Sequence, residues 1–311
     1  MPPSGGHRAK PRSKNVVCLL DKEDALFVPS GTQANLVALM THCQRGDEYI
    51  VGQSAHCYRW EGGGAAVLGS IQPQPLTHQP DGSLALDEII AAIKPDDAHF
   101  ARTRLLTLEN TIGGKVLSLE YLAGACTTAR AYGLALHLDG ARVFNAAVKL
   151  GVPVAQIAAP FDSVSCCLSK GLGAPIGSLL LGSTAFIAQA RRWCKMLGGG
   201  MRQAGMLAAA GIYALDHHIE RLVDDHVCAA SLATGLATFP GLNVASVQTN
   251  MVFVTLDAAM GMALHEHLAV HGVAVTAMKM KQCTQLRWVT HSDVTQSDVD
   301  AALRVVADFC V

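Results

Sequence analysis

Short apolar runs alternate with helical patterns along most of this 311-residue chain, and this alternation restricts the folds that it can adopt. Each run has the length of a buried strand and is followed by a turn and a segment with helical periodicity. The expected strands are residues 25–28, 49–51, 104–108, 134–138, 163–168 and 177–181. The expected helices are residues 33–43, 86–93, 118–132, 141–150 and 184–196. The pattern predicts an α/β fold with a mainly parallel sheet covered by helices on both faces.

A second, smaller domain is expected toward the C-terminus. Residues 203–225 are rich in Ala and nearly free of helix breakers, so they predict a long helical region that links two domains. The expected elements beyond it are strands at 250–256 and 285–289 and helices at 258–271 and 296–309. We therefore expect a disordered, Pro-, Gly- and cation-rich arm over 1–18, a large cofactor-binding domain over 19–220 and a small α+β domain over 221–311.

Composition excludes several classes of partner. The formal net charge is −1 and only 16% of residues are charged, so no global field attracts nucleic acid or an anionic membrane. No apolar run has the length and freedom from charge of a membrane span, and the first twenty residues lack the apolar core of a signal peptide. The ten cysteines show no CxxC pair and no metal-ligand spacing, which favours a reduced cytoplasmic protein without a metal site.

Polar residues follow several expected strands, and in open α/β sheets ligands bind beyond the carboxyl ends of the strands. Ser30-Gly31-Thr32 lies between a strand and a helix. Gly31 lets the backbone approach a ligand, and the N–H groups at the start of the helix suit a phosphate dianion. Taken alone, this turn would be interpreted as an ordinary strand-to-helix connection, so its meaning depends on the other loops.

Asp139 ends a strand that is otherwise apolar. A buried carboxylate requires a cationic partner. A protonated pyridine nitrogen is one candidate, and its pairing with Asp makes a cofactor ring an electron sink. The alternative is a structural ion pair with Arg142, three residues further on, although Arg142 could instead face an anionic ligand.

Lys170 follows the expected strand at 163–168 directly, where a solvated surface lysine is the less favoured interpretation. Burial favours a neutral amine, which is the form that a Schiff base requires. His56 follows the strand at 49–51, and its imidazole could stack on a flat cofactor or move protons. Taken alone, His56 is more typical of a structural histidine.

Two further segments carry cations. Lys195 and Arg202 flank three consecutive glycines, an arrangement that suits an anion site and equally a solvated linker. Arg287 interrupts an apolar strand and could clamp a substrate carboxylate through two parallel hydrogen bonds. Its alternative is a rim charge on an edge strand.

Together these segments resemble the low-specificity L-threonine aldolases, close to the L-allo-threonine type. That family belongs to the β-eliminating lyase superfamily and to the fold-type I, aspartate-aminotransferase-like enzymes that use pyridoxal 5′-phosphate. The resemblance runs from about Ala25 to the C-terminus and implies a mainly parallel seven-stranded sheet. The segments that carry it are residues 29–39, 63–75, 108–111, 137–142, 168–173 and 198–203.

The resemblance implies a role for each residue in cofactor binding. Lys170 forms the Schiff base, Asp139 pairs with the pyridine nitrogen, and His56 stacks on the ring. The turn Ser30-Gly31-Thr32 holds the cofactor phosphate, and Arg202 reaches a phosphate across a dimer interface. The family is a homo-oligomer, a dimer or a dimer of dimers.

The implied substrate is a small β-hydroxy-α-amino acid whose carboxylate is bound by Arg142 and Arg287, with Lys195 close by and Arg142 also near the cofactor. Cleavage of L-threonine or L-allo-threonine would give glycine and acetaldehyde. His56 is the expected base, acting directly or through water. The alternatives are a β-elimination on the same scaffold and a protein that binds pyridoxal phosphate without turnover.

The chain departs from the family pattern in two places, and the first departure is the reason for the alternative without turnover. Family members begin with a segment like Asp-Leu-Arg-Ser-Asp-Thr-Val-Thr and a Gly-Asp-Asp-x-Tyr-Gly loop, and this chain shows neither. A truncated or altered N-terminus is expected to weaken substrate binding and assembly more than cofactor attachment. Relatives also often have His after Glu-Asn-Thr, where this chain has Ile112, so the discrimination between threo and erythro substrates is left open.

Overall fold

The computed structural model describes residues 13–310, which form two compact units. The first unit comprises residues 13–112 and 117–219, and the second comprises residues 113–116 and 220–310. A disordered arm was expected over residues 1–18, of which residues 1–12 lie outside the described residues. The expectation is wrong for residues 13–18, because Ser13–Leu20 form helix α1. Val16 and Leu20 are buried on one face of α1, which packs against its neighbours α8 and β1.

The first unit is built on a seven-stranded sheet with the strand order β1-β7-β6-β5-β4-β2-β3. The strands are β1 (Asp24–Val28), β2 (Asp47–Gly52), β3 (Gln72–Leu76), β4 (Arg102–Glu109), β5 (Ala135–Asp139), β6 (Ser163–Cys167) and β7 (Ser178–Gly182). β7 is antiparallel to β1 and β6, and the other neighbours pair in parallel. The mainly parallel seven-stranded sheet is thereby confirmed. β3 was not expected because it contains Pro73 and Pro75, but prolines are tolerated at a sheet edge, where β3 lies.

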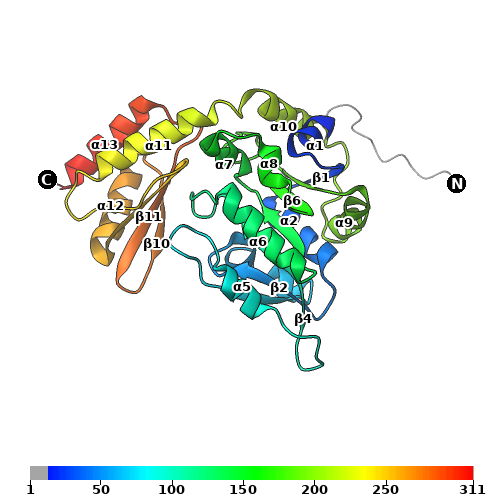
Figure 1. Cartoon of the computed structure of the whole chain (residues 1–311). Coiled ribbons are helices and arrows are strands. Elements are labelled where there is room, and N and C mark those ends of the chain that lie inside the picture. The colour runs from blue at the N-terminus through cyan, green and yellow to red at the C-terminus, as the bar shows by residue number, and fades with distance from the viewer. Residues whose placement is uncertain (1–12, 311) are drawn as a thin grey trace. The chain divides into compact units, whose positions relative to one another are not determined.

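Helices of the first unit connect these strands and pack on both faces of the sheet, with α6 on one face and α2 on the other (Figure 1). They are α2 (Gly31–His42), α3 (His56–Arg59), α4 (Gly64–Val67), α5 (Leu86–Ala92), α6 (Leu119–Ala131), α7 (Val143–Leu150), α8 (Val154–Ala158), α9 (Thr184–Met196) and α10 (Gly205–His217). Apolar side chains of α2 and α9, such as Ala38 and Ile187, form a core with Leu180 of β7. Within residues 13–310, no helix combines the length and the apolar character that a membrane span requires.

The helical region expected over residues 203–225 consists of two helices. α10 ends at His217, and α11 (Leu222–Leu236) begins after a break at residues 218–221. The break has no Gly or Pro, so the sequence carries no breaker signal there. It is fixed by a tertiary contact, because His218 Nδ1 lies 2.6 Å from the carbonyl oxygen of Leu172.

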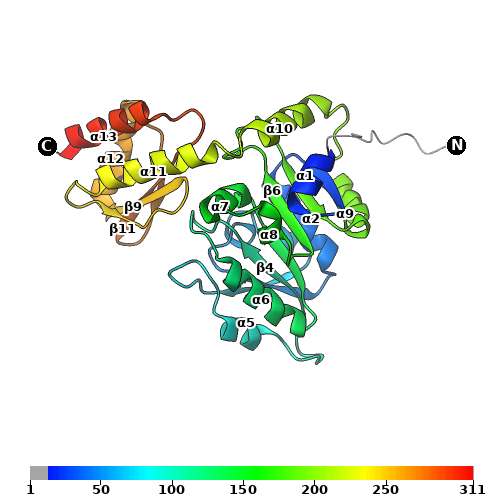
Figure 2. The same cartoon turned by 45° about the horizontal axis from the view of Figure 1, so that its top comes forward.

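The second unit contains an antiparallel sheet with the order β10-β11-β9-β8, packed with α11, α12 (Ala258–Val270) and α13 (Gln296–Cys310) around one apolar core (Figure 2). Its strands are β8 (Asn243–Val244), β9 (Met251–Asp257), β10 (Thr276–Lys279) and β11 (Cys283–Val289). Burial alternates along β11, where Leu286 and Trp288 lie in the core. Arg287 therefore points to the opposite face of the sheet.

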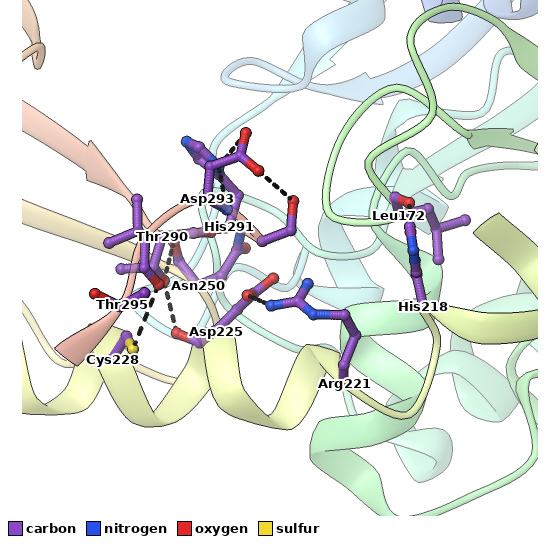
Figure 3. A network of polar contacts seen from close by, with 12 residues as sticks. Leu172, His218, Arg221, Asp225, Cys228, Asn250, Thr290, His291, Asp293 and Thr295 are labelled. Atoms are coloured by element: carbon purple, nitrogen blue, oxygen red, sulfur yellow. Dashed lines mark hydrogen bonds and ion pairs between the residues drawn. The ribbon is translucent and has the colours of Figure 1, made fainter. Parts of the chain in front are cut away.

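A buried ion pair stabilises the start of α11 (Figure 3). Arg221 Nη2 donates to Asp225 Oδ1 at 2.7 Å, and only 1% of Asp225 is exposed. Burial raises the pKa of the Asp225 carboxyl, and the hydrogen bond from Arg221 opposes that shift. The hydroxyl of Thr290 donates to the carbonyl oxygen of Asp225 at 2.6 Å, and the amide of Asn250 donates to the carbonyl oxygen of Thr290 at 2.9 Å.

Candidate active site

Charged residues lie at or just beyond the carboxyl ends of three neighbouring parallel strands of the first unit. Glu109 and Asp139 face each other in the last pair of residues joined by β4 and β5. Asp139 is also paired with Ser165 of β6, and Lys170 follows two residues after Leu168, just past the end of that strand. The alternation of strands and helices thus places an amine and two carboxyl groups at one edge of the sheet.

Asp139 is buried, and hydrogen bonds hold each of its carboxylate oxygens. Oδ1 accepts from the backbone N–H of Ala141 at 3.1 Å, and Oδ2 accepts from the side-chain amide of Asn35 at 2.7 Å. Both donors are neutral, so they orient the carboxylate without neutralising it. An acidic group in this setting favours a cationic ligand.

Glu109 is half-buried, and its Oε2 accepts from the backbone N–H of His56 at 2.7 Å. Desolvation raises the pKa of Glu109, the charge of Asp139 raises it further, and the cations of Lys170 and Arg142 oppose the shift. These opposing charges act on one carboxyl group, which shows that Lys170 and Arg142 lie in the neighbourhood of the acidic pair.

His56 begins α3 and is held by a second carboxylate. Its Nδ1 lies 2.8 Å from Glu61 Oε1, and the His56 side chain is 40% exposed while that of Glu61 is 4% exposed. Burial raises the pKa of the Glu61 carboxyl, and the hydrogen bond from His56 opposes this. One polar atom from each of His56, Glu61 and Asp139 lies within 4.8 Å of the others. His56 therefore presents an accessible ring at the edge that Asp139 and Lys170 occupy.

The turn Ser30-Gly31-Thr32 forms the start of α2. Ser30 caps the helix, because its Oγ accepts from the backbone N–H of Gln33 at 3.1 Å. The helix begins at Gly31, two residues earlier than the sequence predicted, so the N–H groups of Gly31 and Thr32 belong to its first turn and have no helical acceptor. A Cβ at position 31 would lie 2.9 Å from Cys167 Sγ, so the turn packs closely against the end of β6.

The remaining expected residues lie elsewhere in the chain. Lys195 and Arg202 are exposed near the end of α9 and in the segment before α10. Arg287 belongs to the second unit, on β11, where its Nη2 donates to Thr276 Oγ1 at 3.3 Å. Arg287 Nε is buried and has no hydrogen-bond acceptor among the described residues.

Sequence reasoning assigned no role to three residues that complete this site: Asn35, Glu61 and Glu109. Glu109 ends an apolar strand in the same way as Asp139, so the same signal was present for both. Asn35 is the polar member of an otherwise apolar buried run in α2, which also could have marked it. Glu61 gave no comparable signal, because it follows a short surface helix.

Pyridoxal 5′-phosphate fits this set of donors. A helix N-terminus with free N–H groups suits its phosphate, and a lysine beyond β6 supplies the amine. Asp139, held by neutral donors, suits a protonated pyridine nitrogen. The fold and this site define an α/β enzyme of the fold-type I class that depends on pyridoxal 5′-phosphate.

The chain belongs to the beta-eliminating lyase family, whose model matches residues 11–259, and within that family to the low-specificity L-threonine aldolases. The low specificity L-threonine aldolase of Escherichia coli strain K12 is 53% identical over 281 residues, which are 90% of this chain and 83% of that protein. The expected family resemblance is thereby confirmed.

Solved structures share the fold. A threonine aldolase from Leishmania major has a TM-score of 0.84 at 22% identity and covers 96% of this chain and 89% of its own. A serine palmitoyltransferase from Sphingomonas wittichii has a TM-score of 0.75 at 19% identity and covers 96% of this chain and 74% of its own. These similarities confirm the predicted aspartate-aminotransferase-like fold.

Proposed function

We propose that this chain cleaves small β-hydroxy-α-amino acids, L-threonine or L-allo-threonine among them, to glycine and an aldehyde. The observation that supports this most is the gathering of Lys170 and the buried Asp139 beyond two adjacent parallel strands, in a chain 53% identical to a low specificity L-threonine aldolase. For threonine substrates the aldehyde is acetaldehyde.

The residues at the sheet edge divide the task of holding the cofactor. Lys170 would supply the amine, the first-turn N–H groups of Gly31 and Thr32 together with Ser30 would bind the phosphate, and Asp139 would pair with the ring nitrogen. When bound, pyridoxal phosphate accepts the electron pair released at the α-carbon of the substrate. The buried and oriented Asp139 carboxylate would stabilise positive charge on the ring nitrogen and so favour that chemistry.

His56 is the group that moves the proton of the substrate hydroxyl. When its Nδ1–H donates to Glu61, the other ring nitrogen, Nε2, is left as an acceptor. Nε2 takes the hydroxyl proton as the Cα–Cβ bond breaks and the hydroxyl carbon becomes the aldehyde carbonyl. Return of a proton to Cα completes glycine, so atoms and charge balance over the cycle.

Arginine side chains are assigned to the substrate carboxylate. Arg287 is assigned this role from the family resemblance, and a guanidinium can bind a carboxylate through two parallel hydrogen bonds. Arg142 lies beside the acidic pair and is assigned to both cofactor and substrate, with Lys195 as a further cation of the site.

We assign a homo-oligomeric state in which Arg202 binds the cofactor phosphate of a second copy. Large apolar side chains exposed on α10 support an interface there, since Met206 is 85% exposed and Tyr213 is 59% exposed. Sedimentation velocity of the purified chain and of Met206→Glu tests this. A monomeric wild type contradicts the assignment, and dissociation of the variant supports it.

The activity is tested with purified protein, added pyridoxal phosphate and L-allo-threonine. Aldehyde formation is expected in the wild type and in Lys149→Ala, which alters an exposed lysine of α7. Lys170→Ala is expected to lose both turnover and the visible absorbance of the covalently held cofactor. Pyruvate and ammonia without aldehyde would assign β-elimination instead, and a wild type that binds no cofactor would refute the proposal.

A further inference from the structure

Asn35 is a buried amide in the middle of an apolar helical surface. It lies in α2 within the buried run 34–40, and only 1% of the residue is exposed. An amide in such a place destabilises the fold unless its hydrogen bonds are satisfied. Asn35 is three residues after Thr32 and four after Gly31, so it projects from the same face of α2 as the phosphate-binding turn.

The side chain of Asn35 contacts two carboxylates. Its Nδ2 donates to Asp139 Oδ2 at 2.7 Å and to Glu61 Oε1 at 2.9 Å. Both N–H groups of the amide are thereby used, each on a different acid. Glu61 Oε1 is also the atom that lies 2.8 Å from His56 Nδ1. A single amide therefore links Asp139 to Glu61, the carboxylate that holds His56.

The contacts of Asn35 on its two sides fix the orientation of its amide. Asn35 Oδ1 lies 2.8 Å from Ser165 Oγ, which donates to it, and 3.3 Å from His137 Nε2. A rotated amide would place its oxygen against two carboxylates and its N–H groups against a hydroxyl and an imidazole. The two carboxylates, which only accept, and the Ser165 hydroxyl, which donates to Oδ1, therefore select one orientation.

The polar groups behind Asn35 carry no charge at neutral pH. Burial lowers the pKa of His137 to about 3 and that of His42 to about 4. His137 Nδ1 lies 2.8 Å from Ser163 Oγ, which in turn lies 2.7 Å from His42 Nε2. A chain of neutral groups thus runs from His42 to Asn35.

We infer that Asn35 is a positioning residue, which holds Asp139 and Glu61 in fixed relative places through the two N–H groups of its side chain. This inference rests on the proposed placement of the cofactor ring nitrogen against Asp139 and on the proposed role of His56. Asn35 aligns the Asp139 carboxylate with the ring nitrogen. Through Glu61 it also fixes the direction in which the His56 ring presents Nε2.

The size-matched variant Asn35→Asp and the truncation Asn35→Ala distinguish hydrogen bonding from packing. Asp has nearly the volume of Asn but offers no N–H to either acid and adds a negative charge beside them. Loss of hydrogen bonds to charged groups is expected to weaken pyridoxal phosphate binding by about ten- to a hundredfold in Asn35→Ala, and further in Asn35→Asp. If Asn35 only fills space, Asn35→Asp will instead lie closer to the wild type than Asn35→Ala.

The experiment titrates each purified protein with pyridoxal phosphate and records the dissociation constant, the visible absorbance maximum, and kcat and KM for L-allo-threonine. Both Asn35 variants are expected to shift the absorbance maximum and to lower kcat more than they raise KM. The matched control is Asn250→Ala, which removes a buried amide of the second unit that donates to the carbonyl oxygen of Thr290 (Figure 3). It is expected to lower Tm and leave the dissociation constant within about twofold of the wild type.

The outcomes separate this inference from the proposed function. Wild-type affinity and absorbance in both Asn35 variants, with turnover by the wild type, would overturn the role of Asn35 and leave the proposed function intact. A loss of affinity in Asn250→Ala equal to that in Asn35→Ala would reduce the Asn35 effect to general destabilisation and overturn the inference as well. A wild type without a Lys170-dependent absorbance would overturn both.

Discussion

Glu109 and Asp139 occupy paired positions at the ends of β4 and β5, so a half-buried and a buried carboxyl group share one edge of the sheet. The backbone N–H of Asn110 donates to the carbonyl oxygen of Asp139 at 3.0 Å, which fixes the separation of the two chain segments. Desolvation and then the charge of Asp139 raise the pKa of Glu109 to about 8. This shift favours the protonated form of Glu109, in which the pair carries one negative charge fewer.

Glu109→Gln is expected to flatten the pH dependence of stability in the cofactor-free protein. Because the pKa of Glu109 is higher in the folded state than its ordinary 4.5, its stabilising contribution is present below pH 4.5 and is lost as pH rises to about 8. The loss should reach a few kcal/mol and be absent from the variant. Urea unfolding across this pH range measures it.

The control for this series is Glu266→Gln, since Glu266 is exposed to solvent and lies away from both ends of α12. Its free energy of unfolding should follow the wild type at every pH. A Glu109→Gln protein with the wild-type slope would contradict the assignment of the pH dependence to Glu109.

The two acids also show how far the sequence predicts this site. Asp139 was identified because an acid ends an apolar strand, and Glu109 meets the same criterion once β4 is extended one residue beyond the expected end at 108. Asn35 could not be assigned in this way. Its partners lie 26, 104 and 130 residues away in the chain, and the rotation of its amide depends on all of them together.

The sequence likewise predicted some elements of the fold and missed others. Apolar runs located the strands that lie inside the sheet, because burial on both faces leaves a continuous apolar signal. The edge strand β3 lacks that signal, since its residues are only partly buried and include Pro73 and Pro75. The break after α10 depends on the contact between His218 and the carbonyl group of Leu172, which no local pattern contains.

Gly31→Ala is expected to weaken cofactor binding through a clash with Cys167. The new Cβ would lie 2.9 Å from Cys167 Sγ, a contact that forces the start of α2 away from β6. Overpacking of this kind destabilises proteins by about 1–3 kcal/mol, and it displaces the N–H groups assigned to the phosphate. Titration with pyridoxal phosphate and thermal unfolding measure the two effects.

A double-mutant cycle with Cys167→Ala tests the cause. Removing Sγ makes room for the methyl group, so Gly31→Ala should cost much less stability in the Cys167→Ala background than in the wild type. Gly205→Ala is the control, because a Cβ at position 205 meets no atom within 4 Å. Additive effects of the Gly31 and Cys167 substitutions would exclude the clash.

Arg221→Met is expected to destabilise the second unit strongly at neutral pH. It removes the partner of Asp225, which is buried to 1% exposure, and breaking one side of a buried ion pair costs about 3–5 kcal/mol. Burial already raises the pKa of Asp225. Without Arg221 the acid can escape the penalty only by binding a proton, so the loss should shrink as pH falls.

Asp225→Asn in the Arg221→Met background separates charge from packing. The double variant should recover part of the stability at neutral pH, because no unpaired carboxylate remains. Chemical unfolding of the four proteins at neutral and acidic pH provides the comparison. A penalty for Arg221→Met that is independent of pH would contradict the assignment to Asp225.

Substitutions of His56 separate its two assigned roles. His56→Phe keeps a flat ring for stacking but loses both nitrogens, so pyridoxal phosphate should bind with nearly wild-type affinity while kcat falls by about 10²–10⁴-fold. His56→Asn keeps a donor that can reach Glu61 in place of Nδ1 but loses Nε2 and the ring. It should therefore lose kcat to a similar extent and also bind the cofactor more weakly.

Cofactor titration and aldehyde release from L-allo-threonine give both quantities for each variant. Retained turnover in either variant would exclude Nε2 as the group that takes the hydroxyl proton, and unchanged affinity in both would remove His56 from the cofactor contacts.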